Sequence, residues 1–419
     1  MLGMLEPEPE KRREWWRFAT VDITPLRRHR DFRLLFIGRL VSFFGTMITF
    51  VAVPYQVYQL SHSTLLVGLL GLVELAALFV FAMLGGAMAD AADRRTMVLL
   101  SEAGLMVGSL PRPTLWLIFG VTLLWGSLDA LRRPSLEAML PLLVDRDELA
   151  AAGALSSLRG TVGLIAGPAL GGVLITVIGL PLTYMVDVAT FVVGLACLYL
   201  MRAVPPPVDA ERPSLRRVVE GLRYALSRPE LIGTYVADIV AMAFGMPMAL
   251  FPAIAQGLGG ASVLGLLYAA PAVGSFLFFA TSGWARHVHR HGLGVIVAAT
   301  LWGLSIIGFG LATGLFAALG FLVLAGAADA MSGLYRKLIW NQTIPDSLRG
   351  RLASIELLSY SIGPTVGNFE AGVVATLVNV RFSVLSGGVL TVIGSIACAL
   401  ALPAFRQYDE RVWRAKQTA

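Results

Sequence analysis

Four ionisable residues stand far inside long apolar stretches of this chain. They are Glu74, Asp238, Asp329 and Arg159. A buried charge is costly unless it is paired, and a carboxyl group removed from water can take up and release a proton near neutral pH. Glu74 is therefore our first candidate for proton coupling, followed by Asp238 and Asp329. A hydrogen-bonding role is the alternative for Glu74, and Arg159 either serves as a counter-ion to one of these carboxylates or extends toward water.

The stretches that hold these residues are long enough to cross a membrane. Hydrophobic residues make up 56% of the chain and charged residues 14%, against roughly 45–50% and about 25% in soluble domains. Leu65–Ala89 exceeds the roughly 20 residues that a helix needs to cross about 30 Å of hydrocarbon. Glu74 lies roughly 14 Å from the outer end of this stretch, near the membrane mid-plane. We expect Glu102, Asp187 and Glu370, which lie nearer an interface, to reach water.

Lysine and arginine residues alternate along the chain in a pattern that predicts orientation. Of the 33, 29 lie before the first stretch, in every second gap between stretches, or in the tail. Short cytoplasmic loops retain Lys and Arg, whereas translocated loops lack them. The pattern predicts a multi-pass protein of the cell membrane with both termini in the cytoplasm. It also explains the net charge of +6 without a nucleic-acid partner.

We predict an all-α membrane protein with twelve transmembrane helices, because lipid leaves an unclosed chain no other way to satisfy its backbone. The ranges are 34–58, 65–89, 97–110, 114–131, 150–177, 182–201, 231–255, 261–282, 293–312, 315–335, 353–378 and 382–403. The third is short, at roughly 21 Å, and crosses only if the bilayer thins locally. Its loss as a span would invert the charge pattern downstream, so we keep it.

The predicted helices divide into two sets of six. The expected parts are a cytoplasmic N-terminal segment (1–33), a first bundle (34–201), a cytoplasmic linker (202–230), a second bundle (231–403) and a cytoplasmic tail (404–419). Within the linker, the apolar residues 215, 218, 219, 222 and 226 fit one stripe of an amphipathic helix.

Two short patterns recur in the same order in both halves. Gly126–Ala130 returns as Gly326–Ala330, and Gly167–Gly171 returns as Gly363–Gly367. The recurrence favours duplicated halves of like orientation. That is a transporter architecture, whose substrate site lies between the halves near the membrane mid-plane.

The gap between the second and third stretches holds glycine, acid and base at short spacing. Gly86 permits close packing at a helix end, and Asp90 can face the positive N-terminus of another helix. Arg94 and Arg95 can form charge-assisted pairs with carboxylates on neighbouring cytoplasmic helix ends. Pairs that form in one conformation and break in another would act as a latch. The alternative is that these arginines only anchor the topology.

This gap resembles the signature of the major facilitator superfamily, Gly-x-x-x-Asp-Arg/Lys-x-Gly-Arg/Lys-Arg/Lys. Gly86, Asp90, Arg94 and Arg95 match it, whereas Ala91 and Asp93 depart from it. The sequence Asp93-Arg94-Arg95 at the end of this gap is similar to the one found in the branch of enterobactin exporters and multidrug-efflux proteins. Phe32–Phe36, Gly68–Glu74, Phe244–Pro247 and Leu348–Arg351 are similar to that branch too.

The resemblance covers roughly residues 31–405 and implies the major facilitator fold of two pseudo-symmetric six-helix bundles. It also implies that the latch reaches the eleventh helix, with Asp129 and Glu356 as candidate partners of Arg94. The equivalent loop of the second half holds His287, His289 and His291. These histidines suggest a metal site or a pH sensor, but we expect a solvated basic loop.

The fifth predicted helix is rich in small residues at four-residue spacing. It carries Gly163, Gly167, Pro168, Gly171 and Gly172, and its counterpart carries Gly363, Pro364 and Gly367. Small residues let helices approach closely, and proline with glycine makes a kink point. The pattern resembles the superfamily's antiporter motif, which is associated with export in exchange for protons. Plain helix packing is the alternative interpretation.

These features favour a secondary active exporter of small amphipathic molecules, such as drugs or siderophores, that exchanges them for protons as a monomer. No Walker loop, metal-ligand spacing or nucleophile elbow occurs, so we expect no enzyme activity, no cofactor and no metal. An importer, a symporter or a facilitative carrier is the second hypothesis. A non-transporting membrane receptor or scaffold is the third. Substrate identity is not readable from the sequence.

Overall fold

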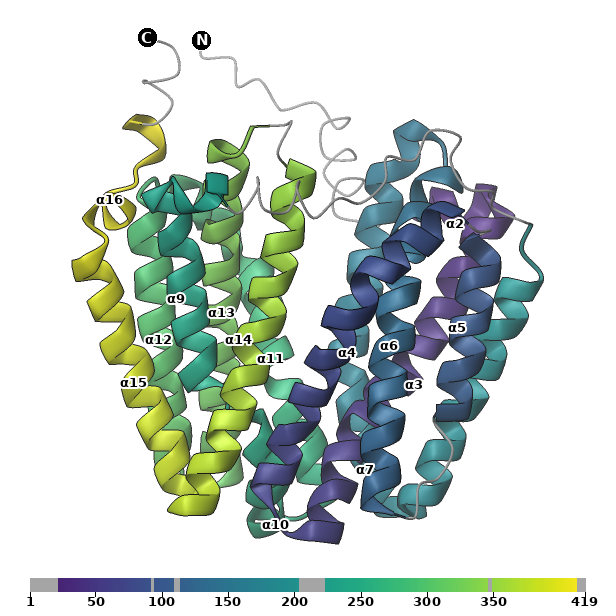
Figure 1. Ribbon diagram of the computed structural model, residues 1–419, viewed down its shortest axis with the longest axis horizontal. Helices are drawn as coiled ribbons and strands as arrows, with labels where there is room; N and C mark the ends of the chain where they lie inside the picture. Colours follow the sequence, from purple (N-terminus) through teal and green to yellow (C-terminus); the bar gives the residue numbers. More distant parts are fainter. Residues whose placement is uncertain (1–21, 92–93, 109–113, 203–222, 346–348, 413–419) are drawn as a thin grey trace, which may run out of the picture.

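The computed structural model describes residues 22–91, 94–108, 114–202, 223–345 and 349–412. Apart from loops and short 3₁₀ turns, the described residues are α-helical (Figure 1). Most of the predicted amphipathic linker helix lies outside these residues, so that expectation stays a prediction.

The first part of the chain folds into a five-residue helix and five helices of 15 residues or more. They are α2 (Thr24–Arg28), α3 (Arg30–Ser61), α4 (Thr64–Ala91), α5 (Arg94–Gly108), α6 (Leu115–Met139) and α7 (Leu149–Tyr199). The 3₁₀ turns η1 (Leu140–Leu142) and η2 (Arg146–Glu148) connect α6 to α7. Within α7, Gly179 leaves the helical conformation at φ 77° and ψ 166°, and Pro181 follows it. A residue with a side chain is disfavoured at this φ, so the glycine makes the turn possible.

The second part begins with a broken helix and continues with five long ones. They are α9 (Pro229–Gly245), η3 (Met248–Leu250), α10 (Phe251–Leu258), α11 (Ala261–Thr281), η4 (Ser282–His287), α12 (His291–Leu311), α13 (Leu315–Thr343), α14 (Arg349–Leu377), α15 (Val380–Ala401) and α16 (Pro403–Arg406). Nine helices of the described part are long and apolar enough to cross a membrane. At 15 residues, α5 is too short to count among them.

One predicted helix is interrupted. We expected a continuous span over 231–255, but α9 ends at Gly245, and the chain passes through η3 before α10 begins. Pro247 causes the break, because proline has no N–H to donate and disfavours the α conformation of Met246, which is the helix C-cap. The sequence prediction missed this break because it used only the apolar composition of the segment.

A second predicted helix is too short. We ended it at residue 335, but α13 continues to Thr343. Arg336 and Lys337 therefore belong to the helix and not to a loop. Arg336 is one of the largest fully buried side chains. One of the two positive charges that suggested a helix end is therefore buried inside the protein.

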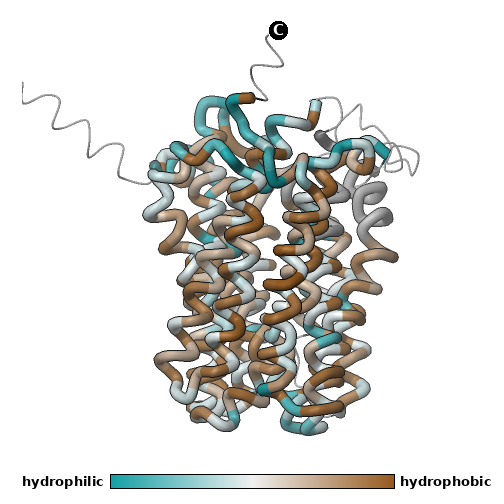
Figure 2. The backbone as a smooth tube through the Cα atoms, turned by 90° about the vertical axis from the view of Figure 1, so that its left-hand side faces the viewer, coloured by the Kyte–Doolittle hydropathy of each residue, from teal (hydrophilic) through white to brown (hydrophobic). Residues whose placement is uncertain are grey.

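Among the described residues, the helices of each sequence half pack mainly on one another, and several contacts join the halves. In the first part α3 packs on α7, and α4 on α6. In the second part α12 packs on α13 and α15, and α9 on α14. The most extensive connecting contacts are α4 with α14 and α7 with α11. The largest apolar cluster combines Val51, Ile175 and Tyr184 of the first part with residues of α9 to α15. Figure 2 shows hydrophilic positions concentrated at the end of the helical bundle that is drawn at the top.

Candidate functional site

Two adjoining cavities lie between residues of the first and second sequence halves. Their volumes are about 150 Å³ and about 480 Å³. Both are lined by Met47, Phe50, Met248 and Tyr268. Small-molecule sites are typically apolar clefts of about 300–1,000 Å³ with a few placed polar groups. The second cavity falls within this size range, and the apolar lining with a few polar groups suits a small amphipathic molecule.

Glu74 lines the first cavity, together with Trp125 of α6 and Asn368 of α14. The Glu74 side chain is exposed, although it lies near the middle of the membrane-spanning part of α4. The indole nitrogen of Trp125 is buried without a hydrogen-bond partner among the described residues. The cavity thus combines an accessible carboxyl group with an unused hydrogen-bond donor.

Asp238 and Asp329 line the second cavity, as does Arg336. Arg336 Nη1 lies 2.5 Å from Asp238 Oδ2, and the two residues are 2% and 5% exposed. The Arg336 guanidinium lies 5.0 Å from the centre of the Tyr360 ring, a cation–π contact. Asp329 is half-buried and lies within electrostatic reach of Arg336 and Asp238.

Sequence reasoning missed Arg336 because it was assigned to a cytoplasmic loop. Its spacing from Asp329, seven residues or about two helical turns, could have shown that both share one face of α13. Its partner Asp238 lies on α9, and nothing in the sequence spacing predicts that pair. A carboxylate at the centre of a span is a hint that a buried cation is near.

Asp129 belongs to a buried charge network in the first half. Asp129 Oδ1 lies 2.9 Å from Arg132 Nη2, and Asp129 Oδ2 accepts a hydrogen bond from Arg133 Nε at 2.6 Å. Arg132 also forms an ion pair with Glu102 of α5. Glu102 is 3% exposed, so the expectation that it reaches water was wrong.

The expected latch is only partly described. The side chains of Gly86, Asp90, Arg94 and Glu356 lie outside the part of the structure with described side chains, and their pairing stays a prediction. Arg95 is described. Its Nε donates to Leu198 O at 2.8 Å and its Nη2 to Tyr199 O at 2.5 Å. It therefore binds the carboxyl end of α7, where a cation is favoured by the helix dipole.

The remaining ionisable candidates differ in their burial and in their hydrogen bonds. Arg159 is half-buried, its Nε has no hydrogen-bond partner among the described residues, and no described ion pair joins it to a cavity carboxylate. Asp187 is 0% exposed and accepts a hydrogen bond from Thr49 Oγ1 at 2.5 Å. The expectation that Asp187 reaches water was therefore wrong. Glu370 is half-buried, and its Oε2 is buried.

The glycines of α7 line two helix contacts. Gly163, Gly167 and Gly171 face Phe43, Met47 and Ile48 of α3. Gly172 faces α11: a Cβ there would lie 2.5 Å from Ala261 O and 2.9 Å from Gly265 N. Pro168 lines the second cavity. These small residues therefore let α7 approach α3 and α11 closely.

The small residues of α14 likewise line a helix contact and the second cavity. Gly363 and Gly367 face Met242 of α9, and Pro364 lines the second cavity. On the opposite face, α14 contacts α4. Thr64 Oγ1 donates to Gly372 O at 3.2 Å and lies 3.2 Å from Thr376 Oγ1. These contacts join the two sequence halves beside the first cavity.

A family model described as a transmembrane secretion effector matches residues 20–416. The chain belongs to this family of the major facilitator superfamily. The resemblance found in the loop before α5 is therefore confirmed over nearly the whole chain.

Two proteins of similar sequence are consistent with this family assignment. The chain is 31% identical over 401 residues to the enterobactin exporter EntS of Citrobacter koseri, covering 92% of this chain and 96% of that protein. It is also 31% identical over 409 residues to EntS of Salmonella typhimurium, covering 93% and 96%.

Solved structures of major facilitator transporters share the fold. A POT family transporter in complex with 5-aminolevulinic acid has a TM-score of 0.72 at 12% identity, covering 90% of this chain and 97% of that one. An inward-facing bacterial homologue of the lysosomal transporter Spinster has a TM-score of 0.69 at 16% identity, covering 92% and 97%. The family and its relatives are transporters, so this chain is a multi-pass membrane transporter and not an enzyme.

Proposed function

We propose that this major facilitator protein exports small amphipathic molecules, of the siderophore or drug class, in exchange for protons. The observation that carries the proposal is the pair of joined cavities, in which Glu74 and Asp329 stand among aromatic and methionine side chains. Similarity to enterobactin exporters supports export and a siderophore-like substrate. The protein works as a monomer, because one chain supplies both sides of the cavity.

The proposed topology has twelve crossings with both termini in the cytoplasm. To the nine long apolar helices of the described part this topology adds three crossings. The segments of α7 before and after Gly179 count as two crossings instead of one. The 29-residue helix α14, which is not among the nine, also crosses, and α5 crosses despite its length because a short helix can thin the bilayer. Residues 34–201 form one bundle and residues 231–403 the other. The loops rich in Lys and Arg are then all cytoplasmic, and the contact of Thr64 with α14 lies on the outer side.

Proton exchange is assigned first to Glu74, because its carboxyl group is accessible from the cavity. Asp329 is the second candidate, and Asp238 is the third because Arg336 already neutralises it. A protonated Glu74 is neutral, and a deprotonated Glu74 offers a charge and an acceptor to the substrate. Competition between proton and substrate for one group is sufficient to couple their movements in opposite directions.

In this proposal the two bundles rock about α7 and α14, and this movement opens the cavities to one side of the membrane at a time. The small residues of α7 (Gly163, Gly167, Pro168, Gly171 and Gly172) and of α14 (Gly363, Pro364 and Gly367) form the hinge surfaces. Contacts of α4 with α14 at Thr64 and Gly372 close the outer side. The residues Gly86, Asp90, Arg94, Arg95, Asp129 and Glu356 form the cytoplasmic latch in the opposite state.

Everted membrane vesicles test this function. Respiration acidifies their interior, so a proton-coupled exporter accumulates enterobactin or a fluorescent amphipathic dye inside them. We expect accumulation that requires the protein and that collapses when an ionophore removes the pH gradient. Accumulation that survives loss of the gradient would exclude proton coupling. Accumulation only in right-side-out vesicles would establish import and contradict the proposal.

A further inference from the structure

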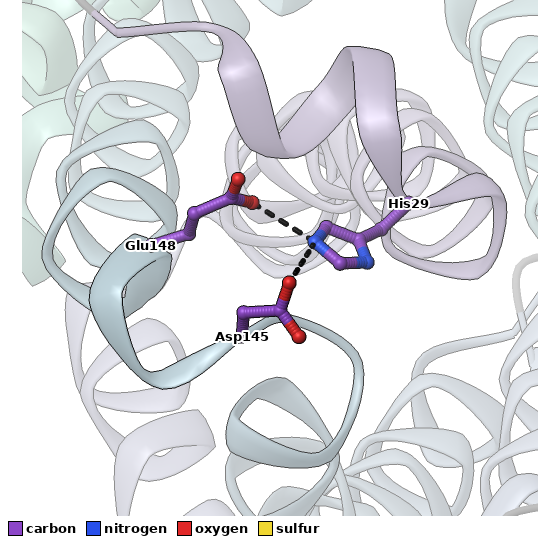
Figure 3. Close-up of side chains that lie close together, drawn as sticks. All are labelled: His29, Asp145 and Glu148. Atoms are coloured by element: carbon purple, nitrogen blue, oxygen red, sulfur yellow. Dashed lines mark hydrogen bonds and ion pairs between the residues drawn. The ribbon is translucent and has the colours of Figure 1, made fainter.

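Three side chains from distant parts of the sequence converge beside the first long helix, outside both cavities. His29 lies between α2 and α3, Asp145 immediately precedes η2, and Glu148 ends η2 (Figure 3). His29 Nε2 lies 2.9 Å from Glu148 Oε2 and 3.8 Å from Asp145 Oδ2. One imidazole nitrogen therefore faces two carboxylates.

The three atoms are spaced like the ligands of one metal ion. All lie within 4.8 Å of one another. Nitrogen and oxygen ligands bound about 2.0–2.2 Å from a zinc ion lie roughly 3.0–3.5 Å apart at octahedral or tetrahedral angles. The observed spacings bracket this range, so small rotations of the exposed Asp145 side chain bring all three atoms to a common centre.

The surroundings hold two ligands firmly and leave the third side open. The Glu148 side chain is 7% exposed and that of His29 23%, whereas that of Asp145 is 71% exposed. An apolar cluster of Phe32, Val144, Ala152 and Leu155 fixes the backbone beneath them. The open side gives access to water molecules, which can complete the coordination of an ion.

Arg28 is the one described cation in contact with this group. Its Nη1 lies 3.1 Å from Glu148 Oε1, which leaves Glu148 Oε2 directed at His29. The Arg28 side chain is 67% exposed and can move away. Its charge opposes a bound cation, so it lowers the affinity of the site without blocking a ligand atom.

We propose that His29, Asp145 and Glu148 form a binding site for a divalent transition-metal ion such as Zn²⁺. One imidazole with two carboxylates suits such ions, whereas Mg²⁺ and Ca²⁺ favour oxygen ligands alone and Cu⁺ favours sulfur. A bound ion ties the start of α3 to the connection between α6 and α7. No residue of the site lines the cavities, so the proposal does not depend on the transported substrate.

A second histidine cluster serves as an internal comparison. His289 Nδ1 and His291 Nε2 lie 3.9 Å and 3.6 Å from Glu410 Oε2. Among the described residues, only the His29 cluster places three ligand atoms within 4.8 Å of one another. The comparison cluster ties the chain's C-terminal part to the start of α12, and we expect it to bind metal more weakly.

Calorimetric titration of the detergent-purified full chain, stripped of metal, tests the proposal. We expect saturable binding of Zn²⁺ at one site and no comparable binding of Mg²⁺. His29→Gln keeps a hydrogen-bonding side chain beside Glu148 but should weaken Zn²⁺ binding at least about tenfold. Asp145→Asn should weaken it less, and Arg28→Gln should strengthen it.

His289→Gln is the matched control and should leave the affinity unchanged. Size-exclusion profiles identify any variant that fails to fold. The proposal is overturned if Zn²⁺ does not bind saturably to the wild type, or if folded His29→Gln binds it as tightly as the wild type. Loss of binding in His289→Gln would place the ion at the other cluster and overturn it as well.

Discussion

Single residues in the cavities differ in their freedom to carry a proton. Glu74 is accessible and forms no ion pair with a described residue, whereas Asp238 is buried against Arg336. Releasing the Asp238 carboxylate for protonation also disturbs the cation beside it. Glu74 has no such constraint, and for this reason it comes first among the proposed proton carriers.

Glu74→Gln should abolish proton-coupled accumulation in everted vesicles. Glutamine keeps the size and a hydrogen-bonding group but carries no exchangeable charge at this position. Immunoblots of the membrane fraction should show unchanged amounts of protein. Glu370→Gln is the matched control, because Glu370 lies on α14 but lines neither described cavity. Full coupled transport by Glu74→Gln would refute the assignment.

The Asp238–Arg336 pair should show strong coupling in stability. Removing one partner of a buried ion pair costs about 3–5 kcal/mol, because the other charge stays buried. Asp238→Leu and Arg336→Met should each lower the melting temperature of the purified protein. The double variant should recover much of that loss, since both charges are then gone. Additive losses in the double variant would contradict a direct interaction.

At the scale of helices, apolar stretches predicted most boundaries well. The expected range 261–282 corresponds to α11 (Ala261–Thr281), and 293–312 corresponds to α12 (His291–Leu311). A long apolar stretch indicates that a segment is buried in lipid, and the neighbouring residues alone are enough to recognise it. The break at Pro247 and the buried Arg336 were missed because apolar composition hides a kink and because a cation's partner on another helix is not a local signal.

Gly172→Val should impair transport by separating α7 from α11. A Cβ at Gly172 meets backbone atoms of Ala261 and Gly265, which cannot rotate away. Gly160→Val, on the same helix, is the matched control because nothing lies within 4 Å of a Cβ there. Vesicle accumulation, normalised to protein in the membrane, should fall only for Gly172→Val. Equal losses in both variants would indicate a general effect of valine on the helix.

At the scale of the whole molecule, residues from both sequence halves line each cavity. Phe50 and Tyr268 come from α3 and α11, and both line both cavities. The recurrence of short patterns in the two halves predicted a site between them. It did not predict which side chains face inward, because helix rotation about its own axis is set by tertiary packing. Substrate identity depends on those rotations, which explains why the sequence leaves it open.

Cysteine labelling should establish the proposed topology. In a background without Cys197 and Cys398, Ser227→Cys should react only from the cytoplasmic side and Thr313→Cys only from outside. Both positions are exposed in the structure. A membrane-impermeant maleimide applied to intact cells and to everted vesicles distinguishes the two sides. Labelling of Ser227→Cys in intact cells would invert the topology and with it the proposed direction of transport.

The central claim is that substrate and proton compete for Glu74 within one cavity. The most direct test adds enterobactin to weakly buffered, detergent-purified protein and records released protons with a pH indicator between about pH 5 and about pH 8. Linkage predicts release of up to about one proton per molecule bound in the wild type, and none attributable to the protein in Glu74→Gln. Saturable binding with the same proton release in both proteins would contradict the claim.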